Sequence, residues 1–207
     1  MRTVVITGAS GNLGKAVAQA FARDKLVPLD VKGGVNLLDM ESIRVALKDV
    51  ERVDVLCNIA GGFRMGPPVH ETIDKDWNFL MDLNARTVIN MSRVVVPLML
   101  KAGGGKIVNI GAFAAQKGAA QMGAYIASKS AVIRLTETMA AELRDKNINV
   151  NCVLPTIIDT PENRAAMPDA DPRKWVAPEA LADVIAFLCS DAARAIHGAA
   201  VPVTGLS

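Results

Sequence analysis

The sequence predicts a single α/β domain in which helices cover both faces of a mainly parallel sheet, the doubly wound arrangement. Short β-branched runs alternate with helical patterns along all 207 residues, as expected for strands joined by crossover helices. Apolar runs such as DVLC at 54–57 and KIVNI at 106–110 lack in/out alternation, which is typical of parallel strands covered on both faces. No linker, repeat or low-complexity segment divides the chain, so we expect one domain over residues 1–207.

Seven strands and five helices account for most of the chain. The expected strands are Thr3–Ile6, Leu26–Leu29, Val35–Leu37, Val53–Cys57, Lys106–Ile110, Asn149–Leu154 and Ala200–Val203. Helical patterns lie at Leu13–Arg23, Ser42–Val50, Ile73–Lys101, Tyr125–Lys146 and Glu179–Ser190. Their alternation places a helix after every strand except the second and the last.

The connection between the second and third strands is unusually short. Only residues 31–34 separate Asp30 from Val35, whereas a parallel crossover normally takes a dozen or more residues. No helix fits there, so the third strand is either a short parallel edge or the second arm of a hairpin. We favour the parallel edge, because Pro28 in the second strand suits a position near the sheet edge.

Composition excludes several classes of function. The formal charge is +2 and the basic residues are scattered, so nucleic acid is not an expected partner. The three cysteines and two histidines show no metal-ligand spacing, so no metal site is predicted and the thiols read as buried and reduced. The chain shows no signal peptide, and its longest strongly apolar run has seven residues, far below the ~20 of a membrane span. We expect a cytoplasmic protein with a small-molecule substrate.

A glycine-rich turn follows the first strand directly and opens a helix. It reads Thr7-Gly-Ala-Ser-Gly-Asn-Leu-Gly14, and such a turn lets the backbone approach a pyrophosphate at the helix N-terminus. Asp30 follows Gly8 by 22 residues, a spacing at which a carboxylate can bond the adenosine ribose of a Rossmann-type domain. It would repel the 2′-phosphate of NADP, and Val31 follows it. The sequence therefore favours NAD, with Lys32 keeping NADP as the alternative.

Two further motifs follow the central strands. Asn58-Ile59-Ala60-Gly61 comes after the fourth strand, and Tyr125-Ile-Ala-Ser-Lys129 begins a predicted helix. Residues four apart share a helix face, so Tyr125 and Lys129 project together. An ammonium beside a phenol can lower its pKa toward the working pH, as acid–base catalysis requires.

Taken in this order, the motifs resemble the short-chain dehydrogenase/reductase family over essentially the whole chain. The resemblance implies that Tyr125 exchanges a proton with the substrate, that Lys129 holds the nicotinamide ribose and that Asn84 orders a proton-relay water. It also implies a homodimer or homotetramer formed through the long helices. Residues implied to bind the cofactor are Gly8, Gly11, Asn12, Leu13, Gly14, Asp30, Asn36, Leu37, Asn58, Ala60, Gly61, Tyr125, Lys129, Pro155, Ile157 and Thr160.

The sequence departs from the family pattern at two positions. Asn12 stands where the family turn commonly has glycine, and asparagine tolerates the left-handed region. Ala112 stands thirteen residues before the tyrosine, where the family usually has its catalytic serine. The nearest polar candidates are Gln116 and Lys117.

Both departures recur in the dihydropteridine reductase branch, which the stretch from Asp159 to Asp171 also resembles in the place of the substrate lid. Reducing a quinonoid ring spreads charge over a conjugated system, so the second donor that a simple ketone needs is dispensable. The sequence therefore predicts NADH-dependent reduction of a quinonoid or pteridine-like substrate. Two alternatives stay open: a carbonyl reductase or alcohol dehydrogenase without the serine, and a non-catalytic dinucleotide sensor.

Overall fold

The computed structural model describes all 207 residues and has a central sheet of six parallel strands in the order β2-β1-β3-β4-β5-β6. The strands are β1 (Thr3–Thr7), β2 (Lys25–Leu29), β3 (Val55–Asn58), β4 (Gly105–Ile110), β5 (Ile148–Pro155) and β6 (Ala200–Val203). The helices are α1 (Asn12–Ala20), α2 (Met40–Ala46), α3 (Asp74–Met81), α4 (Thr87–Ala102), α5 (Gly123–Leu143), α6 (Pro161–Ala166) and α7 (Pro178–Leu188). The predicted doubly wound Rossmann-type fold is confirmed.

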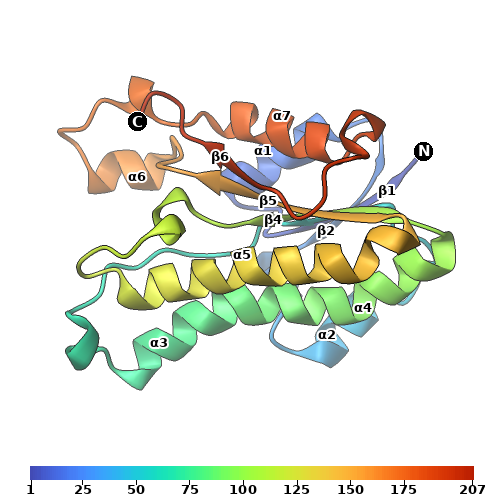
Figure 1. Cartoon of the computed structure of the whole chain (residues 1–207), viewed down its shortest axis with the longest axis horizontal. Helices are drawn as coiled ribbons and strands as arrows, with labels where there is room; N and C mark the ends of the chain where they lie inside the picture. The colour runs from blue at the N-terminus through green and yellow to red at the C-terminus, as the bar shows by residue number, and fades with distance from the viewer.

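Helices cover both faces of this sheet and give the molecule three layers. Helices α1 and α7 lie on one face, and α2, α4 and α5 lie on the other (Figure 1). Successive strand residues serve opposite cores: Val4 and Ile6 pack with α1 and α7, whereas Val5 between them packs with α4. Because both faces are buried, the strands read as continuous apolar runs.

The predicted third strand does not form, and the count of seven strands was wrong by one. After β2 the chain makes a tight turn over Val31–Gly33, and Gly34 adopts a left-handed φ of 81°. The Val35 N–H then donates to the Asp30 carbonyl at 3.0 Å. This turn uses the donor that a strand would offer to β2, so residues 35–37 run on toward α2 and β2 remains the edge of the sheet.

The long predicted helix at 73–101 is interrupted in the middle. A π-helical turn over Asp82–Arg86 separates α3 from α4, and wide turns of this kind often occur at functional sites. The interruption places Asn84 on the side of the helix that faces α5, where its side chain is buried.

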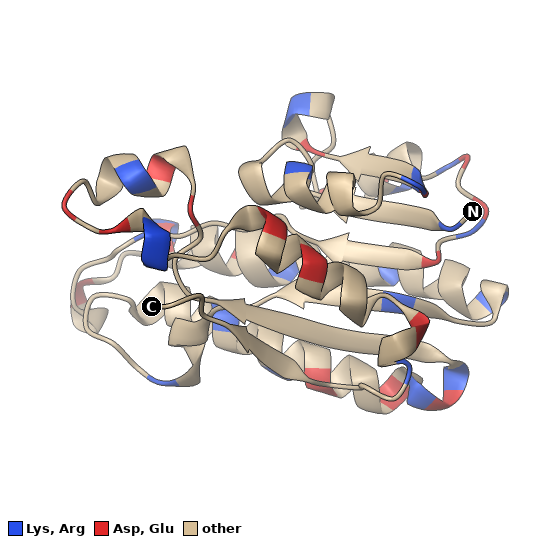
Figure 2. Cartoon of the chain, turned by 90° about the horizontal axis from the view of Figure 1, so that it is seen from above, with Lys and Arg blue, Asp and Glu red and all other residues tan.

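Each edge strand of the sheet carries one proline. Lys25 N–H donates to the Arg2 carbonyl, so by alternation the Pro28 nitrogen faces away from β1. The Val203 carbonyl accepts from Thr156 on the β5 side, so the Pro202 nitrogen likewise faces the open edge. No helix is both long and apolar enough to cross a bilayer. The positions of basic and acidic residues are interspersed along the ribbon in Figure 2.

Candidate active site

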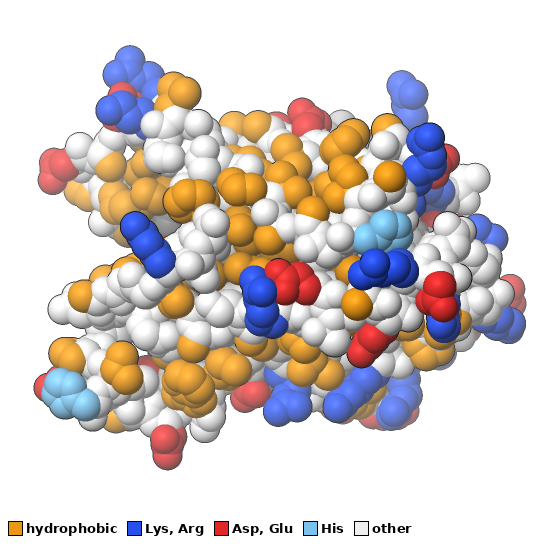
Figure 3. Space-filling model, viewed as in Figure 1, with side chains coloured by type: hydrophobic (Ala, Val, Ile, Leu, Met, Phe, Trp, Pro, Cys, Tyr) orange, Lys and Arg blue, Asp and Glu red, His pale blue; other side chains and the backbone are white.

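A cleft of about 960 Å³ lies at the carboxyl ends of the strands, the edge at which open α/β sheets bind ligands. It opens between α6 and the start of α5, where hydrophobic side chains border the hollow in Figure 3. The loops after five strands line it, at residues 8–14, 30–38, 59–63, 110–114 and 155–163. The remaining wall consists of Leu83 in the π-helical turn, Thr87 in α4, Met122 just before α5, Tyr125 and Lys129 in α5, and Met167 just after α6.

The glycine turn forms one end of the cleft. Gly8 has a φ of 65°, and a β-carbon there would lie 2.9 Å from the backbone of Ala60. Gly14 allows α1 to approach the Gly8 carbonyl, which a side chain would strike. Helix α1 begins with neither a side-chain cap nor an acidic residue in its first turn. Its N–H groups are therefore free for an anion, so the turn fits the pyrophosphate of a dinucleotide.

Asp30 lines the end of the cleft where a Rossmann-type domain would hold adenosine, here called the adenosine end. Its carboxylate accepts the Lys32 N–H at 3.0 Å and the Ser10 N–H at 3.1 Å. These bonds, the one from Lys32 first, lower the pKa of the carboxyl below its ordinary value, so Asp30 is charged at neutral pH. Asn36 and Leu37 also line this end, and α4 holds the loop there because the Asn90 amide donates to the Leu37 carbonyl at 2.9 Å.

The three residues predicted to bind the cofactor at the end of β3 and just after it differ in where they lie. Asn58 does not line the cleft: its buried amide donates to Asn109 on β4 at 2.8 Å and ties the two strands together. Ala60 and Gly61 do line the cleft. A β-carbon on Gly61 would lie 2.9 Å from Asn84 Oδ1 and 3.1 Å from Lys129 Nζ, so glycine is needed where these groups meet the chain.

Tyr125 and Lys129 both project from α5 into the cleft, as their spacing predicts. Lys129 is buried and its ammonium donates to the Ile110 carbonyl at 2.8 Å. Burial lowers the pKa of Lys129 to about 8 and raises the pKa of Tyr125 to about 12. The expected lowering of the phenol pKa is absent from this structure, because desolvation dominates. At neutral pH Tyr125 is therefore a protonated phenol, and its hydroxyl makes no hydrogen bond within the protein.

The Asn84 side chain lies behind the cleft wall and does not line the cleft. Its Oδ1 accepts the Gly62 N–H at 2.9 Å. Its amide donates to the Gly62 carbonyl at 3.1 Å and to Ser128 Oγ at 2.9 Å. Ser128 in turn donates to the Tyr125 carbonyl. These bonds occupy both amide hydrogens of Asn84 and join the Gly62 loop to the helix that carries Tyr125.

Ala112 is buried, lines the cleft and has no hydroxyl substitute nearby. Gln116 and Lys117 are exposed and lie outside the lining. Neither nearby serine replaces it, because Ser130 donates to the Ala115 carbonyl and Ser128 donates to the Tyr125 carbonyl. The serine of the family pattern is therefore missing in space as well as in sequence.

The cleft around Tyr125, here called the substrate end, is almost entirely apolar. Its lining is Gly62, Phe63, Ala112, Phe113, Ala114, Met122, Tyr125, Ile157, Asn163 and Met167. Phe63 meets Tyr125 directly through its ring. Sequence reasoning overlooked Met122, although its place three residues before Tyr125 puts it on the same helix face. It also overlooked Phe113, which directly follows Ala112.

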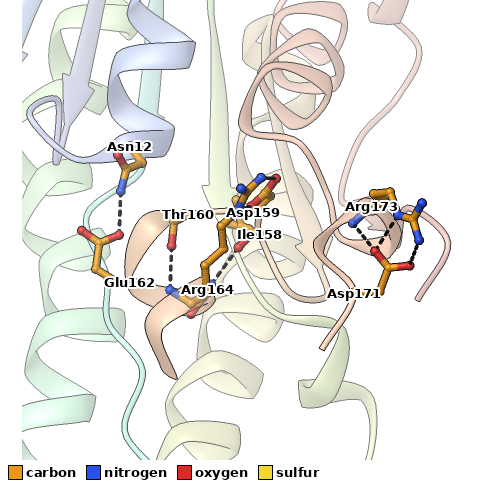
Figure 4. Close-up of polar contacts among 9 residues, drawn as sticks. Asn12, Ile158, Asp159, Thr160, Glu162, Arg164, Asp171 and Arg173 are labelled. Atoms are coloured by element: carbon orange, nitrogen blue, oxygen red, sulfur yellow. Dashed lines mark hydrogen bonds and ion pairs between the residues drawn. The ribbon is translucent and has the colours of Figure 1, made fainter. Parts of the chain in front are cut away.

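Residues 159–171, here called the lid, close one side of the cleft and contain α6. Thr160 lines the cleft and caps α6 by accepting the Asn163 N–H, while the Asn163 amide donates to the Ile158 carbonyl. Pro155 and Ile157 line the cleft just before the lid. Apart from bonds to the residues that directly flank the lid, Thr160 to Asp171 make a single hydrogen bond to the rest of the fold, from the Asn12 amide to Glu162 at 2.8 Å (Figure 4).

Arg164 in the lid and Arg173 just after it are each held by a carboxylate of the lid. Arg164 makes two bonds to Asp159, at 2.6 and 2.7 Å. Arg173 makes two to Asp171, at 2.9 and 3.0 Å. Neither arginine lines the cleft, and Figure 4 shows both turned toward their acidic partners.

Comparisons with known proteins identify the family. The family model described as enoyl-(acyl carrier protein) reductase matches residues 2–205. Dehydrogenase/reductase SDR family member 6 of Aquarana catesbeiana is 30% identical over 236 residues, which cover 99% of this chain and 96% of the relative. The 3-oxoacyl-(acyl-carrier-protein) reductase FabG of Thermotoga maritima is 32% identical over 238 residues, with coverage of 99% and 96%.

A solved structure is also similar over nearly its whole length. It is a protein of Beutenbergia cavernae assigned as an NAD(P)-dependent gluconate 5-dehydrogenase, crystallised with NADP at low occupancy. Its TM-score is 0.86 at 30% identity, and the match covers 99% of this chain and 95% of that one. Together with the glycine turn and the Tyr125–Lys129 pair, these matches show that the chain belongs to the short-chain dehydrogenase/reductase family of NAD(P)-dependent oxidoreductases.

Proposed function

We propose that this protein is an NADH-dependent reductase of a conjugated ring substrate, quinonoid or pteridine-like, with Tyr125 as the proton donor. The observation that carries the proposal is Ala112, which stands in the cleft without any hydroxyl to replace the family's serine. Ketone reduction concentrates charge on one oxygen, where a second fixed donor is worth several kcal/mol. A quinonoid ring spreads that charge, so one donor suffices.

The ionisation of the two α5 side chains supports the reductive direction. Tyr125 is protonated at neutral pH, as a proton donor must be, and its raised pKa of about 12 makes the phenol a weaker acid than an ordinary tyrosine. Lys129 carries its charge below a pKa of about 8, and it would stabilise the phenolate left once the proton has moved. A bound dinucleotide would supply the two electrons and one hydrogen of the reduction.

NADH is the proposed cofactor because of Asp30. The carboxylate is charged and lines the adenosine end of the cleft, where it would bond ribose hydroxyls and repel a 2′-phosphate. Lys32 also lines this end, and the similar Beutenbergia cavernae protein was crystallised with NADP. A comparison of kcat/KM for NADH and NADPH therefore tests the proposed choice of cofactor.

The resemblance of the lid and of the alanine at position 112 to the dihydropteridine reductases supports a pteridine-like or quinonoid substrate. The names of other relatives favour a second candidate, an ordinary carbonyl reductase or alcohol dehydrogenase. FabG of Thermotoga maritima is a 3-oxoacyl reductase, and a relative from Mycolicibacterium smegmatis, 29% identical, is a D-threitol dehydrogenase. In that candidate Tyr125 alone would meet the oxyanion of the substrate.

We further propose a cytoplasmic homodimer or homotetramer that associates through its long helices. Helices α4 and α5 lie side by side on one face of the sheet (Figure 1), which supports this arrangement. Light scattering of the purified protein tests it directly, and a monomer at micromolar concentration would contradict it.

The proposed reaction is tested by following the oxidation of NADH and of NADPH with three substrates. These are a quinonoid dihydropterin, a substituted naphthoquinone and an activated ketone, each measured against the Tyr125→Phe variant as the blank. We expect Tyr125-dependent turnover of at least one ring substrate and a preference for NADH. Brisk reduction of the ketone alone would favour the carbonyl reductase, and tight NADH binding without any turnover would favour the sensor.

A further inference from the structure

We infer that the substrate end accepts an uncharged, quinone-like ring in preference to a pterin or an anionic substrate, and that Asp159 contributes to this choice by withholding Arg164. The inference rests on the proposed function and names the substrate class of the same site. It follows from the hydrogen-bonding groups and the charges that surround Tyr125.

The substrate end offers very few polar partners. Of the side chains that line it, only Tyr125 and Asn163 carry a polar group, and the Asn163 amide already donates to the Ile158 carbonyl at 2.8 Å. The Tyr125 hydroxyl, the second amide hydrogen of Asn163 and the hydroxyl of the neighbouring Thr160 are thus the few free side-chain donors. A pterin buries an amino group, ring N–H groups and a carbonyl, and each unpaired group costs free energy. A quinone has only two carbonyl acceptors, of which Tyr125 satisfies one.

Charge is also kept away from this end of the cleft. Only three charged residues line the whole cleft: Asp30 and Lys32 at the adenosine end, and Lys129, whose ammonium is bonded to the Ile110 carbonyl. Lys117 is exposed and lies outside the lining. An anionic substrate would therefore lose its hydration at the substrate end without gaining a cationic partner.

Arg164 is the cation best placed to change this selectivity. Helix α6 turns Thr160, Asn163 and Met167 toward the cleft, and Arg164 is the immediate neighbour of Asn163. Its guanidinium is turned away, however, and held by both oxygens of Asp159 (Figure 4). Two parallel bonds between arginine and carboxylate are strong and directional, so Asp159 fixes the position of Arg164 and keeps its charge off the substrate. Asp159 is thus a positioning residue for specificity.

The proposed reaction is the two-electron reduction of a quinone to a hydroquinone. The reduced dinucleotide would supply a hydride, which is one proton with two electrons. The Tyr125 hydroxyl supplies the second proton to a carbonyl oxygen of the ring. The quinone becomes a hydroquinone, the dinucleotide is oxidised, and Tyr125 regains its proton from solvent.

The test compares a neutral 2,3-dimethyl-1,4-naphthoquinone, the same ring bearing a sulfonate, and a quinonoid dihydropterin. Steady-state kcat/KM is measured with saturating reduced dinucleotide, and calorimetry measures binding of the two quinones to the protein without dinucleotide. We expect the neutral quinone to exceed the sulfonate and the pterin by at least ~10-fold in kcat/KM. Calorimetry should show the same order between the two quinones.

The variant Asp159→Asn releases Arg164 and should improve binding and turnover of the sulfonate about 10-fold relative to the neutral quinone. The double variant Asp159→Asn/Arg164→Gln should abolish this gain. Asp145→Asn, which breaks the Lys146 pair at the far end of α5, serves as the matched control and should leave the ratio unchanged. If Asp159 had a purely structural effect, Asp159→Asn would lower the activities on the sulfonate and on the neutral quinone together and leave their ratio unchanged. That result would overturn the role given to Asp159.

The remaining outcomes separate this inference from the proposed function. A preference for the pterin, or equal use of the neutral and sulfonated quinones, would overturn the inference and leave ring reduction standing. Reduction of an activated ketone with no reduction of any ring would overturn the proposed function itself.

Discussion

The ring of Phe63 meets the ring of Tyr125 edge to face, with centroids 4.9 Å apart and planes 85° apart. Phe63 is 57% exposed, so one side of its ring covers Tyr125 while much of the rest faces the cleft and solvent. The pair fixes the orientation of Tyr125 and presents an aromatic surface to an entering ring.

Replacing Phe63 by Ala should expose Tyr125 and weaken the binding of ring substrates. We expect kcat/KM to fall about 10-fold, the value of an aromatic pair, and the pKa of Tyr125 to move down from about 12 toward its ordinary value of 10. Tyr125 is the single tyrosine of the chain, so the near-ultraviolet absorbance of the phenolate reports its titration directly. Phe63→Leu is the control that keeps apolar cover without a ring, and an unchanged pKa in Phe63→Ala would contradict the covering role.

Removal of the Tyr125 hydroxyl isolates proton donation from binding. Tyr125→Phe keeps the ring and its contact with Phe63, so dinucleotide affinity should stay within a few-fold. Turnover should fall by about 10²–10⁴-fold, as expected for the loss of general acid catalysis. Stopped-flow turnover and fluorescence titration with NADH measure the two effects, and near-normal kcat would remove Tyr125 from the mechanism.

The charge of Asp30 should decide the choice of cofactor. Asp30→Asn keeps an oxygen that can accept the Ser10 or Lys32 N–H but removes the repulsion of a 2′-phosphate. The preference for NADH over NADPH should narrow about 10-fold or more, measured as the ratio of the two kcat/KM values. A wild-type protein that already prefers NADPH would show that Asp30 does not act in this way.

A hydroxyl restored at position 112 should separate the two enzymatic candidates. Ala112 is buried in the cleft wall, so Ala112→Ser adds a polar group to a site built without one and should leave ring reduction equal or slightly slower. The same variant should gain ketone reduction, by about 10-fold for a donor less well aligned than a native one. Parallel kcat/KM values on a naphthoquinone and an activated ketone give the answer, and brisk ketone reduction by the wild type would favour the carbonyl reductase.

Burial of Lys129 should make the free energy of unfolding depend on pH in the alkaline range. Its pKa is about 8 in the folded state and 10.5 ordinarily, so below pH 8 both states are protonated and the native state bears the cost of a buried charge. Between pH 8 and 10 the unfolded chain binds more protons, so this group raises the free energy of unfolding as pH rises, by about 1–2 kcal/mol.

Comparison with Lys129→Met isolates this effect. Cys152 and Tyr125 have raised pKa values and act in the opposite direction above pH 9, but they do so in both proteins. Denaturant unfolding at several pH values should therefore show the difference between wild type and variant growing in favour of wild type from pH 8 to 10. A constant difference would mean that Lys129 keeps an ordinary pKa.

Local chemistry made the glycine turn and the Tyr125–Lys129 pair readable from sequence, because fixed spacings on a turn or a helix determine which groups project together. Whether residues 35–37 form a strand depends on where the Val35 N–H donates, to a carbonyl of β2 or to the Asp30 carbonyl. Strand propensity does not decide between these two acceptors. Asn58 carries a recognisable motif, yet its side chain turns to Asn109, a partner 51 positions away. The ionisation of Tyr125 was unpredictable for the same reason, since desolvation depends on Phe63 and other distant residues that close over it.

The two prolines at the margins of the sheet have a consequence for how copies of the protein meet. An exposed strand edge is a template on which another chain can add a strand, and this is a common start of aggregation. Pro28 and Pro202 each remove a donor from the outward side of β2 and β6, so both ladders end in an interrupted row of hydrogen-bonding groups. Because residues 35–37 do not form a strand, β2 is an exposed edge of the sheet. Pro28 in β2 therefore hinders edge-to-edge pairing with the sheet of another copy. Any association between copies would then go through helices and loops, where side chains rather than backbone determine the partner.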